Sequence, residues 1–114
     1  MTLQRVKEIL ERHSEMFLRA YVYGSVARGE QDEHSDVDLV LVRRTQAAFF
    51  DRIREVMVLV KELGAVDLLI YTPAELDELV ARRRSKFLQA IVAEGVAFEG
   101  RQGRGAALAA PSRK

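Results

Sequence analysis

The strongest constraint on this chain is a pair of aspartates placed where a β-strand should begin. Asp36 and Asp38 stand one residue apart at the head of the apolar run Val37–Val42, where charge is disfavoured unless it has a partner or a function. Residues two apart in a strand point to the same face, roughly 6.5–7 Å from each other. The two carboxylates should therefore converge on one point, where a hard divalent cation such as Mg²⁺ would find the oxygen ligands that it prefers.

A glycine and a serine precede this pair. Gly24 and Ser25 follow the apolar run Leu18–Tyr23 and are expected to open a short helix. At a strand-to-helix turn they would offer backbone N–H groups and a hydroxyl to a phosphate. A phosphate cradle beside a metal-holding carboxylate pair indicates phosphoryl or nucleotidyl transfer. Arg28 could reach the same phosphate, although an exposed arginine in a polar turn is an equally good interpretation.

A third acid, Asp67, interrupts the otherwise apolar run Val66–Tyr71 near its beginning. If the second and third strands are neighbours, Asp67 shares a face with Asp36 and Asp38. Three ionised carboxylates so close together would raise one another's pKa unless a metal neutralised them. The alternative is structural, with Asp67 forming an ion pair with an arginine of the Arg43-Arg44 pair.

Composition narrows the class of protein. The chain has 114 residues, enough for one small domain, and its 48% hydrophobic and 31% charged residues are typical of a soluble globular protein. The longest apolar runs are about six residues, far short of the ~20 that span a membrane. The absence of cysteine excludes disulfides and thiolate metal sites. We expect a cytoplasmic protein.

The charge is distributed unevenly. All 17 acidic residues lie within residues 1–100, whereas residues 101–114 carry four basic residues and no acid. The mildly acidic part lacks the basic surface that binds duplex DNA. The segment 101–114 has no apolar periodicity, so we expect a nucleotidyl-transferring domain over 1–100 followed by a disordered basic tail.

The remaining pattern alternates helices with strands, which predicts an α/β fold: a small mixed β-sheet with helices packed on one face and the site on the other. Thr72-Pro73-Ala74-Glu75 matches a capping box that begins a helix. Tyr23 and Phe87 are assigned to packing. The expected strands are 18–23, 37–42, 66–71 and 96–99. Two helices are expected over 3–13 and 46–63, and further helices are expected to begin near residues 25, 73 and 87. The side chains expected to form the buried stripe of the longest helix are Phe49, Ile53, Val56, Met57, Val60 and Leu63.

Gly24-Ser25-Val26-Ala27-Arg28-Gly29, followed after five residues by Ser35-Asp36-Val37-Asp38-Leu39, resembles the signature of the minimal nucleotidyltransferases of the DNA polymerase beta-like superfamily. The resemblance runs over roughly residues 3–100 and implies the polymerase beta-like nucleotidyltransferase fold. In such enzymes the matching glycine and serine hold the β- and γ-phosphates of the nucleotide. The first two acids, here Asp36 and Asp38, bind metal, and the third, here Asp67, completes the site and helps to activate the acceptor hydroxyl.

Minimal proteins of this family resemble the antitoxin half of a toxin–antitoxin pair. The resemblance implies a reaction that uses one or two Mg²⁺ ions to transfer AMP from ATP to a tyrosine of a helical HEPN ribonuclease toxin. Two alternatives stay open: a small-molecule acceptor, and a non-catalytic antitoxin that acts by binding. We also expect an apolar patch beside the site, formed by strand residues such as Val40, Val42, Leu69 and Tyr71, that pairs with the toxin or with a second copy of the chain.

Overall fold

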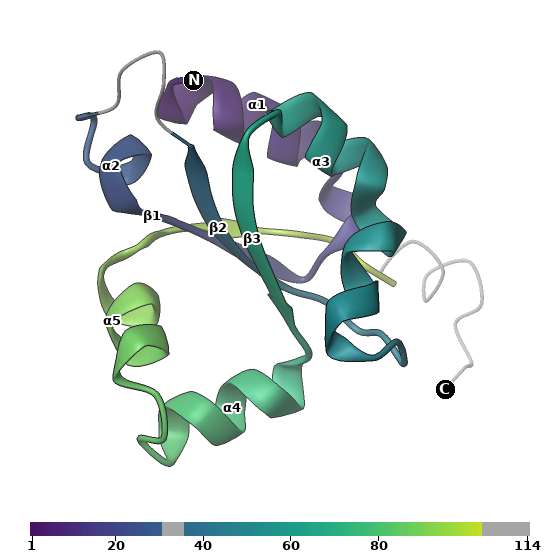
Figure 1. The fold of residues 1–114 in the computed structure, drawn as a ribbon, viewed down its shortest axis with the longest axis vertical. Helices are drawn as coiled ribbons and strands as arrows, with labels where there is room; N and C mark the ends of the chain where they lie inside the picture. The colour runs from purple at the N-terminus through teal and green to yellow at the C-terminus, as the bar shows by residue number, and fades with distance from the viewer. Residues whose placement is uncertain (31–35, 104–114) are drawn as a thin grey trace.

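The computed structural model describes residues 1–30 and 36–103, which form a four-stranded sheet with helices on both faces (Figure 1). Within these two ranges, the helices are too short and too polar to cross a membrane. The helical elements are α1 (Leu3–Arg12), η1 (Ser14–Met16), α2 (Gly24–Ala27), η2 (Phe49–Val56), α3 (Met57–Leu63), α4 (Pro73–Ala81) and α5 (Lys86–Glu94); the strands are β1 (Arg19–Tyr23), β2 (Val37–Val42), β3 (Val66–Tyr71) and β4 (Val96–Glu99).

The strands lie in the order β3-β2-β1-β4. β2 and β3 are parallel, whereas β1 runs antiparallel to both of its neighbours, β2 and β4. The expected mixed sheet is therefore confirmed, and β2, β3 and β4 have the predicted bounds. The arrangement also meets the condition on which the position of the third acid depended, because β2 and β3 are adjacent.

Helices cover both faces of the sheet rather than the single face expected. α1 and α3 pack on one face with α2 at its end, and α4 and α5 pack on the other (Figure 1). Val40 and Val42 point to the second face and are buried there, only 0% and 5% exposed. A strand buried on both faces has a nearly continuous apolar sequence instead of an alternating one. The run Val37–Val42 has that form, and it indicates the second layer.

The helix expected over 46–63 is also different. Ala48 is extended, with ψ 153°, and the chain then forms the 3₁₀ helix η2, which ends where Val56 departs from helical geometry at φ −125°. A 3₁₀ helix has three residues per turn, so the buried side shifts relative to an α-helix. Ile53 and Met57, predicted to be buried, are each 38% exposed. The buried positions are Arg52, Val56, Leu59 and Leu63.

Part of the expected tail contacts the folded domain. The Nε of Arg101 donates to Ser14 Oγ at 3.0 Å. The side chain of Gln102 accepts from the backbone N–H of Arg44 at 2.7 Å and donates to its carbonyl at 2.8 Å. Residues 31–35 and 104–114 lie outside the described residues, so the disorder expected for the rest of the tail stays a prediction.

Arg52 is a buried charge with a full set of partners. Its side chain donates to both carboxylate oxygens of Glu75, at 2.6 and 2.8 Å. It also donates to the carbonyl oxygens of Ile70 and Ala47, each at 3.0 Å. Glu75 accepts in addition from the N–H of Thr72 at 2.9 Å, within the capping box that the sequence predicts. A buried charge is tolerated when it is paired in this way.

We expect Arg52→Met to lower the free energy of unfolding by about 3 kcal/mol, because it leaves Glu75 and two carbonyl groups without their donor. Arg54→Met is the matched control, since Arg54 is exposed on the same helix and its loss should change stability by less than about 0.5 kcal/mol. Urea unfolding monitored by circular dichroism measures both. Equal stability of the two variants would contradict the role assigned to Arg52.

The ion pair of Arg52 and Glu75 should also make the free energy of unfolding depend on pH. The bond with Arg52, the first cause, lowers the pKa of Glu75 from 4.5 to about 2. The pair therefore stabilises the fold fully above pH 4.5, and this stabilisation is lost as the pH falls through 2. Arg52→Met should lose less stability than the wild type between pH 5 and pH 3.

Candidate active site

Three side chains form a row across one end of the sheet. In the strand register Tyr23 of β1 lies opposite Asp38 of β2, and Asp38 lies opposite Asp67 of β3. Register partners point to the same face, and neighbouring strands are roughly 4.8 Å apart. The structure thus places the carboxylates of Asp38 and Asp67 side by side, on the face that α4 and α5 cover further along the strands.

The charges around Asp38 act on one another. Burial is the main cause that raises the pKa of Asp38, and the negative charges of Asp67 and Asp36 raise it further, whereas Arg28 lowers it. Asp36, the residue directly before β2, is exposed, and so is Asp67 on β3. Among residues 1–30 and 36–103, no three acidic or histidine side chains are drawn together closely enough to form a metal cage.

The donor set nevertheless fits Mg²⁺ better than it fits a metal that needs an all-protein cage. Mg²⁺ in nucleotide-binding enzymes is commonly held by one or two carboxylates together with phosphate oxygens of the substrate. Asp38 and Asp67 supply two adjacent carboxylates, and Asp36 supplies a third within electrostatic range. A cation at this end of the sheet would also remove the like-charge repulsion that raises the pKa of Asp38.

Gly24 is the close neighbour of Asp38. It has φ +76°, a conformation that favours glycine, and a Cβ built at this position would overlap with Oδ2 of Asp38. Ser25 follows it, half-buried at the start of α2. Arg28 is exposed and pairs with Glu30 at 2.9 Å, a surface ion pair of small energetic value that another anion can replace.

The strand pattern assigns Tyr23 to packing, but the structure places it in the site. Burial, followed by the charges of Asp38 and Asp67, raises the pKa of Tyr23 to about 12, so its hydroxyl keeps its proton at neutral pH. The sequence signal that could have indicated this role was the position of Tyr23 directly before Gly24, at the end of an apolar run.

Arg43, the alternative partner for Asp67, instead donates to Glu55 at 3.1 Å and to the carbonyl of Met16 at 2.7 Å.

Comparison with known families agrees with this geometry. The family model described as "Polymerase beta, Nucleotidyltransferase" matches residues 4–100 of the chain. The chain belongs to this family. Its sheet carries the acidic residues Asp38 and Asp67 at the strand ends described above.

Individual relatives point the same way. Two proteins of Methanocaldococcus jannaschii are each named "Putative protein adenylyltransferase". Each is 41% identical to this chain over an alignment of 46 positions, and the match covers 35% of this chain. The chain spans about half the length of these curated relatives, 46% of one and 54% of the other. A crystal structure titled as a "putative nucleotidyltransferase" from Sulfolobus solfataricus matches 87% of this chain and 83% of its own, with a TM-score of 0.55 and 25% identity.

We expect Asp38→Asn to abolish Mg²⁺-dependent binding of ATP while leaving the melting temperature unchanged or higher. Burial and the neighbouring acids raise the pKa of Asp38 in the fold. Its ionisation therefore lowers the stability as the pH rises from the ordinary pKa of an aspartate to the raised value, and asparagine removes this loss. Titration calorimetry with Mg²⁺ measures the binding, and thermal denaturation at pH 7 measures the stability. Unchanged affinity for the nucleotide would show that Asp38 is not part of the site.

A pair of glycine variants isolates the contact between Gly24 and Asp38. Gly24 and Gly29 both have positive φ, +76° and +72°, but a Cβ at Gly29 meets nothing within 4 Å. Gly24→Ala and Gly29→Ala should therefore each lose about 1–2 kcal/mol of stability from backbone strain. Only Gly24→Ala should also lose affinity for MgATP, because its methyl group displaces the carboxylate of Asp38. Similar affinities in the two variants would contradict this assignment.

Proposed function

We propose that this protein is a Mg²⁺-dependent nucleotidyltransferase that transfers AMP from ATP to a hydroxyl group of a partner protein. The observation that carries the proposal is the register pairing of Asp38 with Asp67, with Gly24 packed against Asp38. This places two carboxylates and a glycine turn at one end of the sheet, in a chain of the nucleotidyltransferase family. The arrangement supplies what transfer to a hydroxyl needs: a site for the triphosphate and an anionic group beside the attacking oxygen.

In the proposed reaction the acceptor oxygen forms a bond with the α-phosphorus of ATP. The bond between this phosphorus and the oxygen bridging to the β-phosphorus breaks, and pyrophosphate leaves with that electron pair. Asp67 assists the removal of the hydroxyl proton, and Gly24, Ser25 and Arg28 orient the triphosphate. Positioning and electrostatic stabilisation can carry most of such a reaction, so a small scaffold suffices.

The metal would be held by Asp36, Asp38 and Asp67. One or two Mg²⁺ ions, when bound there, supply positive charge that neutralises the triphosphate and the leaving pyrophosphate. The raised pKa of Asp38 supports this role: burial is its main cause, the charges of Asp67 and Asp36 add to it, and a bound cation would offset both.

The surface beside β3 favours a protein acceptor. The patch expected from Val40 and Val42 does not exist, because α4 and α5 bury those residues. Exposed apolar side chains instead lie on η2 and α3; they are Phe50, Ile53, Met57 and Val58. Phe50 and Ile53 border the edge of β3, the strand that carries Asp67. Exposed apolar groups gathered in this way are typical of a surface that binds another protein.

The names of the two curated relatives, each called a "Putative protein adenylyltransferase", also support a protein as the acceptor. We extend this to the minimal members of the family: the partner is a helical HEPN toxin, the acceptor is one of its tyrosines, and the protein acts in the cytoplasm as the antitoxin. The apolar surface on η2 and α3 would bind the partner beside Asp67, so that the tyrosine can enter the site.

We expect Asp67→Asn to lower the rate of AMP transfer at least about 100-fold, as loss of a proton-accepting group does, while ATP affinity changes by less than about threefold. The lost interaction belongs to the transition state. Single-turnover transfer of label from α-labelled ATP to a co-purified helical toxin measures the rate, and calorimetry measures the affinity. Asp77→Asn, which removes an exposed acid from α4, is the control.

The same assay separates the alternatives. Label that appears on a small molecule but never on a protein would replace the protein acceptor with a small one. Silencing of the toxin by Asp38→Asn as well as by the wild type would establish a non-catalytic antitoxin. Equal losses of rate and affinity in Asp67→Asn would make Asp67 a metal ligand without a part in activating the acceptor.

A further inference from the structure

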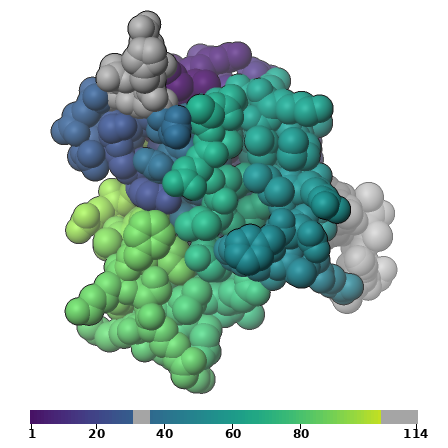
Figure 2. Space-filling view, in the orientation of Figure 1, coloured from purple at the N-terminus to yellow at the C-terminus, as the bar shows by residue number. Residues whose placement is uncertain are grey.

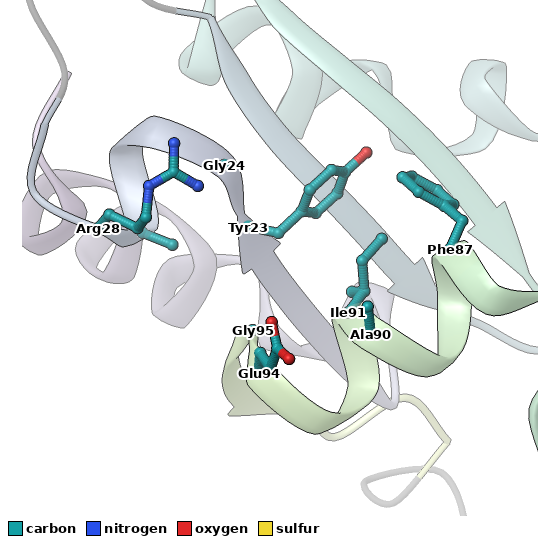
Figure 3. A pocket seen from close by; sticks show the side chains of 9 residues that line it. Tyr23, Gly24, Arg28, Phe87, Ala90, Ile91, Glu94 and Gly95 are labelled. Carbon is teal, nitrogen blue, oxygen red and sulfur yellow. The ribbon is translucent and has the colours of Figure 1, made fainter.

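A pocket of about 480 Å³ opens between α2 and α5, directly beside Gly24. Its volume lies within the roughly 300–1,000 Å³ that is typical of small-molecule sites. The segment coloured blue, which includes α2, and the green of α5 are neighbours on the molecular surface (Figure 2). Figure 3 shows Tyr23 beside Phe87 and Ile91, and Arg28 on the opposite side of the pocket.

The α5 side of the pocket is mostly apolar and partly aromatic, with one acid, Glu94, at the end of the helix. Phe87 and Ile91 are four residues apart and so lie on the same side of the helix. Ile91 is buried, whereas Phe87 remains 51% exposed. The ring of Phe87 packs against that of Tyr23 edge to face, with centroids 5.6 Å apart and an angle of 85°. A phenylalanine on the wall of a pocket, held by one aromatic neighbour and half open to solvent, offers a surface on which a flat ring can stack.

The side of the pocket formed by Tyr23 and α2 adjoins the acidic row. Gly24 lines the pocket and also contacts Asp38. Tyr23 lines it too and is the register partner of Asp38. Arg28 contributes a guanidinium that is exposed and lies within electrostatic range of Asp38. Apart from Glu94, the pocket is therefore charged beside α2 and apolar along α5, as a nucleotide is charged at its phosphates and apolar on the face of its base.

We propose that this pocket holds the base and ribose of the donor nucleoside triphosphate, with the base stacked on Phe87 and the triphosphate reaching past Arg28 and Gly24 to Asp38. The inference rests on the proposed function, since it names where that reaction's nucleotide lies. Stacking on an aromatic ring tolerates any base, so Phe87 contributes affinity and not the choice of base. The competing occupant is the acceptor side chain of a partner, and the experiment below distinguishes the two.

A single tryptophan reports directly on stacking. The chain contains no tryptophan, so Phe87→Trp carries one fluorophore, located in the pocket. ATP with Mg²⁺ should quench its fluorescence saturably, at a concentration that agrees with the dissociation constant of the wild type from calorimetry. Inorganic tripolyphosphate with Mg²⁺, which has no base, should compete with ATP without quenching. Phe50→Trp is the matched control, because Phe50 is 88% exposed on η2, away from this pocket, and should not respond.

Phe87→Ala supplies a second readout that does not depend on fluorescence. Loss of one stacked base should weaken ATP binding by roughly 5- to 150-fold, with the affinity for tripolyphosphate unchanged. Its half-exposed ring makes the fold tolerant of this change, and circular dichroism checks it. If the wild type binds ATP but neither Phe87 variant changes ATP binding or fluorescence, the pocket assignment is wrong and the proposed function stands. If the wild type binds no ATP, both are wrong.

Discussion

The pairing of Arg52 with Glu75 is the interaction on which the two-sided covering of the sheet depends. Arg52 comes from η2, on the first face, and Glu75 stands in the first turn of α4, on the second. They meet at the edge of β3, where the carbonyl oxygen of Ile70 accepts from the same guanidinium. A buried guanidinium that lost a partner would be strongly destabilising. The ion pair therefore fixes the position of the helices on one face relative to those on the other. α5 packs against α4 and thereby takes its place over β1, leaving one end of the sheet open.

That open end has the opposite energetic character. Partial burial, followed by the charges of Asp67 and Asp36, raises the pKa of Asp38. Its register partner Asp67 is exposed. Like charges placed together lower the stability of the fold, and they persist when the rest of the structure compensates for them. The apolar cores on both faces and the Arg52 pair provide that compensation. The repulsion between the acids is therefore confined to this end of the sheet, where the rest of the fold tolerates it.

Much of this could be predicted from the sequence, because short-range patterns determine it. The run Val37–Val42 and the capping box before α4 depend on neighbouring residues, and the proximity of Asp67 to Asp38 requires only that β2 and β3 be adjacent. The burial of Arg52 could not be predicted, because it depends on Glu75, which is 23 residues away, and on a 3₁₀ turn that shifts which side faces the core. Phe87 appeared to belong to a buried stripe, since helical spacing shows which residues share a side but not whether that side ends in a pocket.

For the proposed reaction, the order of the strands gives the nucleotide and the protein acceptor separate approaches. The row of Tyr23, Asp38 and Asp67 runs from β1 through β2 to β3. At its Tyr23 end the row adjoins the pocket of Phe87, and at its Asp67 end it reaches β3, the edge strand. Further along β3, Leu68, Leu69 and Ile70 line a hollow together with Phe50. In-line displacement requires the attacking and leaving oxygens to lie on opposite sides of the phosphorus. A nucleotide held from the β1 side directs its α-phosphorus toward the β3 edge, which is the side from which a protein acceptor can come.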